Sequence, residues 1–343
     1  MTDAPTAADA TRFTFADDVE PGSRQAVLEV LAQLDAPGLD GPVAIRRLEG
    51  GGSNENFVVS TSEVDLAMRL AGLMTERFLF DRPRGLDAHR HAFASGRVPR
   101  LYSSVLPEGH CLSQLVPGRT MTADILAEDD VIELCTETLL KVHHAEPIAG
   151  RRFSMFQDAR TWIDVAHDEG LPLPDDIAAI EAMLERLEAL FDSLDVPDRL
   201  CHNDLQVQNY LIEPGRAWLV DWEYGAMGTP YSDLAMLIHY GALGPEGASR
   251  VFTAYLGVDR PCDHARALLM YFGAAIREAA WSVIAEPVLG PVTGYDYAGS
   301  ARRFFAATAT LMQDSEFEAA LVVGGPSDDD AAVFAQAAER ARR

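Results

Sequence analysis

His202-Asn203-Asp204-Leu205-Gln206-Val207-Gln208-Asn209 is the stretch that decides the fold, and Leu219-Val220-Asp221-Trp222-Glu223-Tyr224 follows it closely. An Asp, an Asn five residues later and a second Asp twelve residues after that are spaced as in sites of phosphoryl transfer. Asp204 is the candidate base, because a carboxylate can accept the proton of a hydroxyl group. Asn209 and Asp221 offer the hard oxygen ligands that Mg²⁺ prefers. The motif therefore predicts a phosphoryl-transfer site.

The residues between the two halves of the motif predict a β-hairpin. Two strand candidates, 209–212 and 217–220, flank the turn Glu213-Pro214-Gly215-Arg216. Such a hairpin would fold Asp221 back toward Asp204. Asn and Asp in isolation are more often turn-forming residues than catalytic ones. The motif and the hairpin together favour the chemical interpretation.

Composition excludes several classes of function. The chain has 343 residues, of which 48% are hydrophobic, and a formal charge of −25, which argues against a nucleic-acid partner. Four cysteines without a CxxC pair indicate reduced thiols. No apolar run reaches the roughly 18–20 residues that span a bilayer, and the first twelve residues lack a signal-peptide core, so we expect a cytoplasmic protein without membrane insertion. Lys141 is the only lysine, so phosphate contacts would fall to arginine.

The hydrophobic periodicity changes along the chain and predicts two lobes. Strand-like runs, among them residues 43–48 and 65–70, come first, and apolar residues at helical spacing dominate from Thr122 onward. We therefore predict an α+β fold with an antiparallel sheet in the N-terminal lobe and a mostly helical C-terminal lobe. The expected divisions are a flexible leader (1–20), a nucleotide-binding lobe (21–116), a catalytic and substrate-binding lobe (117–323) and a peripheral tail (324–343).

A glycine-rich turn in the N-terminal lobe is a second candidate site. Gly50-Gly51-Gly52-Ser53-Asn54 lies between two strand candidates, where backbone N–H groups could approach phosphates and Ser53 or Asn54 could add donors. Glycines in a row more often mark an ordinary turn. Arg69, on the next strand, stands where a positive charge would meet the α and β phosphates, although it could equally be a surface charge.

Several blocks of sequence resemble the choline and ethanolamine kinase family, within the wider aminoglycoside-phosphotransferase and protein-kinase-like fold. The blocks keep the family order between about residues 40 and 315. They include Gly51–Asn56, Ala67–Leu70, Asp81-Arg82, Pro99–Tyr102, Gln114–Arg119, Cys201–Asn209, Leu219–Gly225, Arg277–Trp281 and Tyr295–Tyr297.

The resemblance implies a role for each matching position. ATP and Mg²⁺ would be the cofactors, with Asp204 as base and Asn209 and Asp221 as metal ligands. Nucleotide contacts would come from the N-terminal lobe and the segment that links the lobes: Ser53, Asn54, Arg69, Gln114 and Arg119. The amino-alcohol pocket would contain Gln206, Glu223, Trp281 and Tyr297. Aromatic faces and acidic groups suit a quaternary ammonium, which has no N–H to donate; Trp281 could equally be part of the helix core.

Two segments depart from the family pattern. The family commonly places a Glu three residues after Asp-Arg, on a helix, where it pairs with the basic residue that contacts ATP; Gly85 stands at that position here. Asp87 is a possible substitute. Residues 286–294, with Pro287, Gly290, Pro291 and Gly294, predict a loop beside the acceptor pocket.

The sequence leaves the acceptor open. Choline is expected first and ethanolamine second, and thiamine or an aminoglycoside are alternatives within the same chemistry. A nucleotide-binding pseudokinase or regulator is the alternative from another class, suggested by Gly85. In a third interpretation, a structural phosphate-binding module, Asp204→Asn would change nothing.

Overall fold

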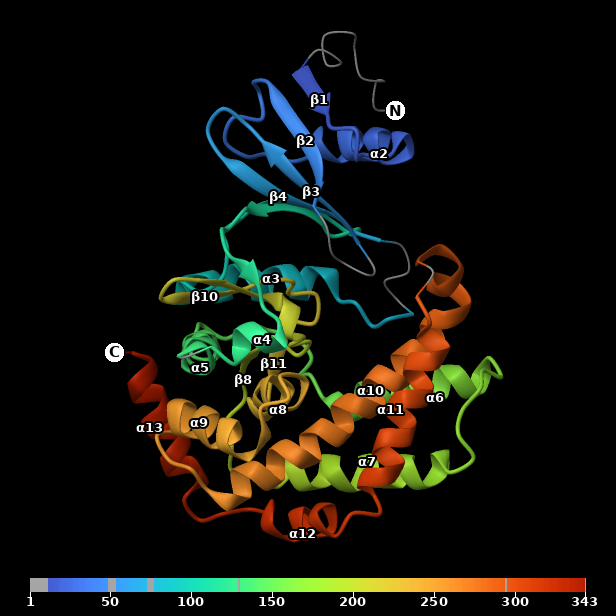
Figure 1. Cartoon of the computed structure of the whole chain (residues 1–343), viewed down its shortest axis with the longest axis vertical. Coiled ribbons are helices and arrows are strands. Elements are labelled where there is room, and N and C mark those ends of the chain that lie inside the picture. The colour runs from blue at the N-terminus through green and yellow to red at the C-terminus, as the bar shows by residue number, and fades with distance from the viewer. Residues whose placement is uncertain (1–11, 49–53, 73–76, 129, 294, 343) are drawn as a thin grey trace.

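A six-stranded sheet forms the N-terminal lobe of the computed structural model (Figure 1), which describes residues 12–342 except 49–53, 73–76, 129 and 294 and the side chains of 291–293. The strand order is β1-β2-β3-β4-β6-β5. β1 pairs parallel with β2, and the other pairs are antiparallel. The strands are β1 (Phe13–Phe15), β2 (Val43–Leu48), β3 (Glu55–Ser60), β4 (Asp65–Leu70), β5 (Leu101–Val105) and β6 (His110–Gln114).

Helix α2 (Pro21–Leu31) covers one face of this sheet (Figure 1). Val27 and Val30 on the helix pack with Val43 and Ile45 of β2 in one buried cluster. In β2 the buried positions alternate with exposed Ala44 and with Arg46, as expected for a strand with one face toward the core. Burial of this face holds the small lobe together.

The expected flexible leader contains a strand. β1 (Phe13–Phe15) lies in register with Val43, Ala44 and Ile45, and Ala16 N donates to Ile45 O at 2.8 Å. The prediction was wrong for this part of the leader because a three-residue edge strand gives too short a pattern to detect. Its parallel pairing also makes the sheet mixed rather than purely antiparallel.

The C-terminal lobe is mostly helical, which confirms the predicted two-lobed α+β fold. The expected hairpin is present as β9 and β10, and β7 joins it in a three-stranded sheet; β8 and β11 form a separate pair. The helices are α4 (Ala123–Leu126), α5 (Val131–His143), α6 (Met155–Asp168), α7 (Ile177–Asp192), α8 (Tyr231–Tyr240), α9 (Gly244–Leu256), α10 (Pro261–Thr293), α11 (Tyr297–Leu311), α12 (Ser315–Val323) and α13 (Asp330–Ala341). The short elements are β7 (Arg119–Thr120), β8 (Arg199–Cys201), β9 (Tyr210–Glu213), β10 (Arg216–Leu219), β11 (Ala226–Gly228) and the 3₁₀ turns Phe93–Ser95 and Val207–Asn209.

Helix α10 crosses the lobe diagonally (Figure 1) and replaces the loop expected at 286–294. The helix continues through Pro287 to Thr293, and its end packs near the start of α11, where Ala298 N donates to Glu286 Oε2 at 2.9 Å. Local Pro and Gly signals were overridden by this packing. By length and composition alone, the segment Pro261–Gly290 contains an 18-residue window apolar enough to cross a membrane. Because 78% of that window is buried in the fold, the helix is part of the core.

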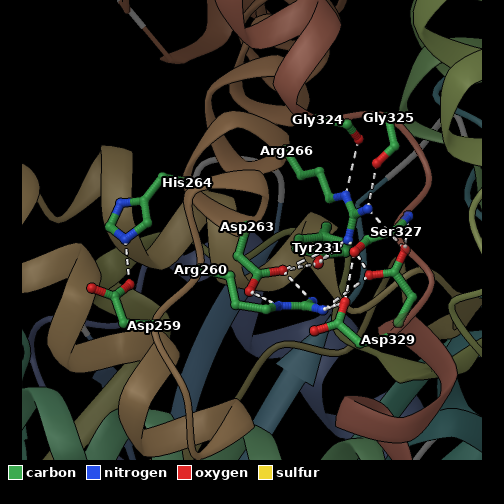
Figure 2. Close-up of polar contacts among 11 residues, drawn as sticks. Tyr231, Asp259, Arg260, Asp263, His264, Arg266, Gly324, Gly325, Ser327 and Asp329 are labelled. Atoms are coloured by element: carbon green, nitrogen blue, oxygen red, sulfur yellow. Dashed lines mark hydrogen bonds and ion pairs between the residues drawn. The ribbon is translucent and has the colours of Figure 1, made fainter.

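The tail from Gly324 onward was predicted to be peripheral, but hydrogen bonds anchor it to the large lobe (Figure 2). Arg266 of α10 is fully buried and donates to Gly324 O at 2.9 Å, to Gly325 O at 2.6 Å and to the Asp330 carboxylate at 2.7 and 2.8 Å. Phe334 of α13 is buried in the core of the large lobe. The tail therefore closes this lobe beside α9 (Figure 1).

Candidate active site

The loop after β8 carries Asp204, and Asp233 of α8 stabilises this loop through hydrogen bonds to its backbone. The buried Asp233 carboxylate accepts hydrogen bonds from His202 N at 2.7 Å and Asn203 N at 2.8 Å. Asn203 has a φ of 64°, in the left-handed region, and its side chain donates to Tyr224 O at 3.1 Å. These bonds fix a strained turn and present Asp204, whose side chain is 30% exposed.

A buried cluster of three side chains near this loop has the composition of a metal site, but its hydrogen bonds support the loop. Side-chain ligand atoms of His143, Cys201 and Asp233 lie within 4.8 Å of one another. Asp233 is already bonded to His143 Nε2 at 2.9 Å and to two backbone N–H groups. Burial, with Asp233 nearby, raises the pKa of the Cys201 thiol, which disfavours the thiolate that binds metals.

The β9–β10 hairpin brings the second half of the motif to Asp204. Val220 N donates to Asn209 O at 3.0 Å, and the His202 ring Nε2 lies 2.8 Å from Val220 O. Asn209 Nδ2 donates to Asp204 O at 2.9 Å, so its amide oxygen is the atom left for a cation. Asp221, with a φ of 65°, is 43% exposed. The oxygens of Asn209 and Asp221 fit a Mg²⁺ site in kind and accessibility.

Glu223, in the loop after β10, bonds to side chains of the N-terminal part of the chain. Its carboxylate is 7% exposed, is bonded to Arg82, and accepts from Asn54 Nδ2 at 3.1 Å. Arg69 Nη1 lies 3.6 Å from Glu223 Oε1 and 3.1 Å from Asp221 Oδ1. Groups from β4, helix α3 (Arg82–Ala92) and the residue before β3 engage this carboxylate, so the acceptor-pocket role expected of Glu223 would require these contacts to change.

Gly85 explains why helix α3 (Arg82–Ala92) offers no glutamate to Arg69. A Cβ at Gly85 would lie 2.7 Å from Trp222 O and 2.9 Å from Glu223 O, so the helix docks directly on that loop. Asp87 is 47% exposed, and its carboxylate lies 3.9 Å from His91. Within the described part of the chain, Arg69 meets carboxylates only from the loop after β10, which supplies the contact that the helix lacks.

The other expected nucleotide contacts have partners of their own. Ser53 lies outside the described residues. Asn54 Oδ1 accepts from Gly72 N at 3.0 Å, and Gln114 Oε1 accepts from Arg100 N at 3.4 Å. Arg119 belongs to the sheet of the large lobe and forms a two-pronged ion pair with Glu128 at 2.8 and 2.9 Å. Nucleotide contact by Arg119 would require this exposed pair to open.

Trp281 and Tyr297, expected in the acceptor pocket, do lie together. Their ring centroids are 5.6 Å apart, and Trp281 also lies 5.3 Å from Phe78. Tyr295, which is 52% exposed, extends the group at 4.7 Å from Tyr297. Gln206 is tied to the catalytic loop by its backbone, with its N–H donating to Asp204 O at 2.8 Å.

Two charged residues of α10 at the site were not assigned a role from the sequence. Arg277 Nη1 lies 3.4 Å from Asp204 Oδ1, and the guanidinium sits 4.2 Å from the centroid of the Tyr224 ring. Burial, with Asp204 nearby, raises the pKa of Glu278 to about 7. Burial also raises the pKa of Asp204, while Arg277 opposes this. The available signal was an Arg-Glu pair inside an apolar helix, three and four residues before Trp281.

Comparison with known proteins agrees with this geometry. The phosphotransferase enzyme family matches residues 44–268, more than half of the chain. The chain belongs to this family. Among solved structures, this phosphotransferase is similar to a choline/ethanolamine kinase family protein from Mesorhizobium loti, with a TM-score of 0.74 and 23% identity over 88% of this chain and 98% of that one. The fold is therefore protein-kinase-like.

LicA proteins are also similar to this phosphotransferase. Protein LicA of Haemophilus influenzae is 24% identical over 234 residues, which cover 60% of this chain and 61% of LicA. The choline kinase LicA of Streptococcus pneumoniae superposes with a TM-score of 0.65 and 20% identity, covering 78% of this chain and 92% of that one, and LicA is also known in complex with AMP. The chain spans about three fifths of the length of the Haemophilus LicA that it matches.

Proposed function

We propose that this phosphotransferase moves the γ-phosphoryl group of ATP to the hydroxyl of a small cationic amino alcohol, choline first and ethanolamine second. One observation carries the proposal: two hydrogen-bonded loops bring Asp204, Asn209 and Asp221 together. Similarity to the choline kinase LicA of Streptococcus pneumoniae supports the acceptor class, and similarity to LicA in complex with AMP supports the nucleotide.

The side chains divide the work of transfer. Asp204 orients the acceptor hydroxyl and takes its proton as the oxygen attacks phosphorus in line. Arg69 faces the phosphates, and its buried Nε has no hydrogen-bond partner among the described residues, which supports a ligand-binding role. Mg²⁺, held by Asn209 and Asp221, would neutralise charge on the phosphate oxygens. Since Arg69 pairs with Asp221 in the free protein, nucleotide binding is expected to redirect this guanidinium to phosphate.

The acceptor side suits a cation. Trp281 offers an aromatic face, and Glu278 adds a carboxylate one helical turn away on the same side of α10. Among the described residues, the Glu278 carboxylate has no hydrogen bond or ion pair. A quaternary ammonium or protonated amine would complete this arrangement. The cytoplasm, where ATP and Mg²⁺ are available, is the expected location.

The acceptor is tested by incubating the protein with Mg²⁺, ATP and choline, ethanolamine, thiamine or an aminoglycoside, while ADP release is followed. Choline should turn over best, and Asp204→Asn should lower kcat by about 10²–10⁴-fold. Best turnover with thiamine or an aminoglycoside would replace the proposed acceptor while keeping the chemistry. ATP binding without turnover on any acceptor would instead favour the pseudokinase alternative, against which the Arg69–Glu223 contact already argues.

A further inference from the structure

A buried guanidinium from helix α10 lies within hydrogen-bonding distance of the proposed base. Arg277 of α10 is 4% exposed, and its Nη1 lies 3.4 Å from Asp204 Oδ1. Its Nε lies 4.0 Å from Asp158 Oδ2 on α6. The cation is therefore placed between two carboxylates that come from different elements.

Aromatic rings fix the orientation of this guanidinium. Its central carbon lies 4.2 Å from the centroid of Tyr224, 4.9 Å from Trp162 and 5.5 Å from Phe153. We call these three rings the ring cage. Planar guanidinium groups stack on aromatic faces, whereas the ammonium of lysine has no plane to align. The ring cage therefore restricts both the position and the rotation of Arg277.

Because Arg277 is hydrogen-bonded to Asp204, fixing the guanidinium also restricts the Asp204 carboxylate. Within the described part of the chain, Arg277 makes the only side-chain hydrogen bond to the Asp204 carboxylate. Among the described residues, the other charged or titratable groups near Asp204 include His202 on its own loop, Asp221 after β10, and the hydroxyl groups of Tyr224 and Tyr240. Glu278 on α10 adds a further carboxylate nearby. Without Arg277, two neighbouring carboxylates would repel Asp204 with no cation bonded to it.

We propose that Arg277 is a positioning residue, which holds the Asp204 carboxylate so that one oxygen remains free for the acceptor hydroxyl. This inference rests on the proposed function. A consequence concerns the substrate: the ring cage is already filled by a cation from the protein itself, so an acceptor ammonium is left with Trp281 and Glu278. Orientation of a catalytic group can be worth about 10²-fold in rate.

The test measures kcat and the KM for ATP separately in Arg277→Met and Arg277→Lys. We expect kcat to fall about 100-fold in Arg277→Met and less in Arg277→Lys, with the KM for ATP within twofold of wild type. Arg266→Met is the matched control, because it removes another buried guanidinium from α10 in the tail anchor. Its kcat per folded molecule should not change.

Chemical rescue separates positioning from general support of the fold. Guanidinium chloride at non-denaturing concentration should restore part of the kcat of Arg277→Ala, whereas NaCl at equal ionic strength should not. A kcat in Arg277→Met within threefold of wild type, or an effect confined to the KM for ATP, would overturn the inference.

Failure of the proposed acceptor can be distinguished from failure of this inference. If the wild type hydrolyses ATP to ADP but phosphorylates no amino alcohol, the proposed acceptor is wrong. The same variants are then compared by their rates of ATP hydrolysis. A crystal structure of Arg277→Met gives a readout without activity: a displaced or disordered Asp204 carboxylate supports the inference, and an unchanged carboxylate refutes it.

Discussion

At the scale of single residues, charge placed inside the protein distinguishes this site. Asp204 and Glu278 lie near each other with Arg277 beside them, and burial raises the pKa of both carboxyl groups. The cost of these charges in the interior is offset by a nearby cation for Asp204. Glu278 is left as the group whose charge can respond to a ligand.

The ionisation of Glu278 predicts a pH-dependent KM for choline. Its pKa is raised to about 7, so the carboxyl group is neutral below that pH and attracts a cation above it. Choline keeps its charge at every pH, so its KM should fall several-fold between pH 6 and 8. This fall corresponds to a gain of about 1 kcal/mol in binding free energy. Steady-state kinetics of wild type and Glu278→Gln check this, and the variant should show a flat profile.

The control is 3,3-dimethylbutanol, an uncharged analogue of choline, whose KM should not change with pH. An equal pH dependence for the charged and uncharged acceptors would contradict a role for Glu278.

Some of these residues could be recognised from local spacing and others could not. Asp204, Asn209 and Asp221 follow from the motif and the hairpin, because both are short-range patterns. Glu223 was placed with the acceptor residues since only the fold shows its partners, Arg82 from α3 and Asn54 beside β3. Contacts between segments far apart in sequence leave no periodic signal.

At the scale of elements, helix α3 and the loop after β10 are in direct backbone contact. Gly85 faces the carbonyl groups of Trp222 and Glu223, and a Cβ at Gly225 would lie 2.5 Å from Ala88 Cβ. The close approach places Arg82 beside Glu223. It also means that the helix supports the loop that carries Asp221.

Gly85→Ala is predicted to destabilise the protein and to impair catalysis. The new methyl group would push against two backbone carbonyls at 2.7 and 2.9 Å, at a cost of about 1–3 kcal/mol. Because the displaced loop bears Asp221, kcat/KM should fall as well. Denaturant unfolding and steady-state kinetics measure the two effects.

Gly22→Ala in α2 is the matched control, since no atom lies within 4 Å of its added Cβ. It should be neutral or slightly stabilising. If Gly85→Ala behaved like Gly22→Ala, the close packing of α3 described above would be wrong.

The bounds of some helices and strands could be predicted from the sequence, and those of others could not. Strands β2 and β4 coincide with their expected ranges, because alternating burial is visible in the sequence. The end of α10 was missed because Pro287 and Gly290 favour a loop locally, while packing against α11 keeps the helix intact.

At the scale of the whole molecule, the C-terminal tail belongs to the large lobe. Arg260, just before α10, and Arg266 of α10 meet Asp263, Asp329 and Asp330 in a network that is buried except at Asp329 (Figure 2). Helix α13 then adds Phe334 to the core. Arg266 and Asp330 are 64 residues apart in the sequence, so no local sequence pattern predicts this network.

Asp330→Ala is therefore predicted to lower the free energy of unfolding by about 3–5 kcal/mol, because it removes the carboxylate that is hydrogen-bonded to the buried Arg266 and leaves only Asp263, at 3.7 Å. Asp328→Ala, an exposed neighbour, should change it by less than about 0.5 kcal/mol. Denaturant titrations compare the two variants. Equal stability of the two would show that the network does not anchor the tail.

The central claim is that Asp204 directs a phosphoryl group from ATP to the hydroxyl of choline, and the most direct measurement is ³¹P NMR of a reaction with Mg²⁺, ATP and choline. The account predicts a growing phosphomonoester resonance from phosphocholine, matched by loss of the γ-phosphate signal, with wild-type protein and almost none with Asp204→Asn. A phosphocholine signal of equal rate in Asp204→Asn, or none in either protein while ATP is bound, would contradict it.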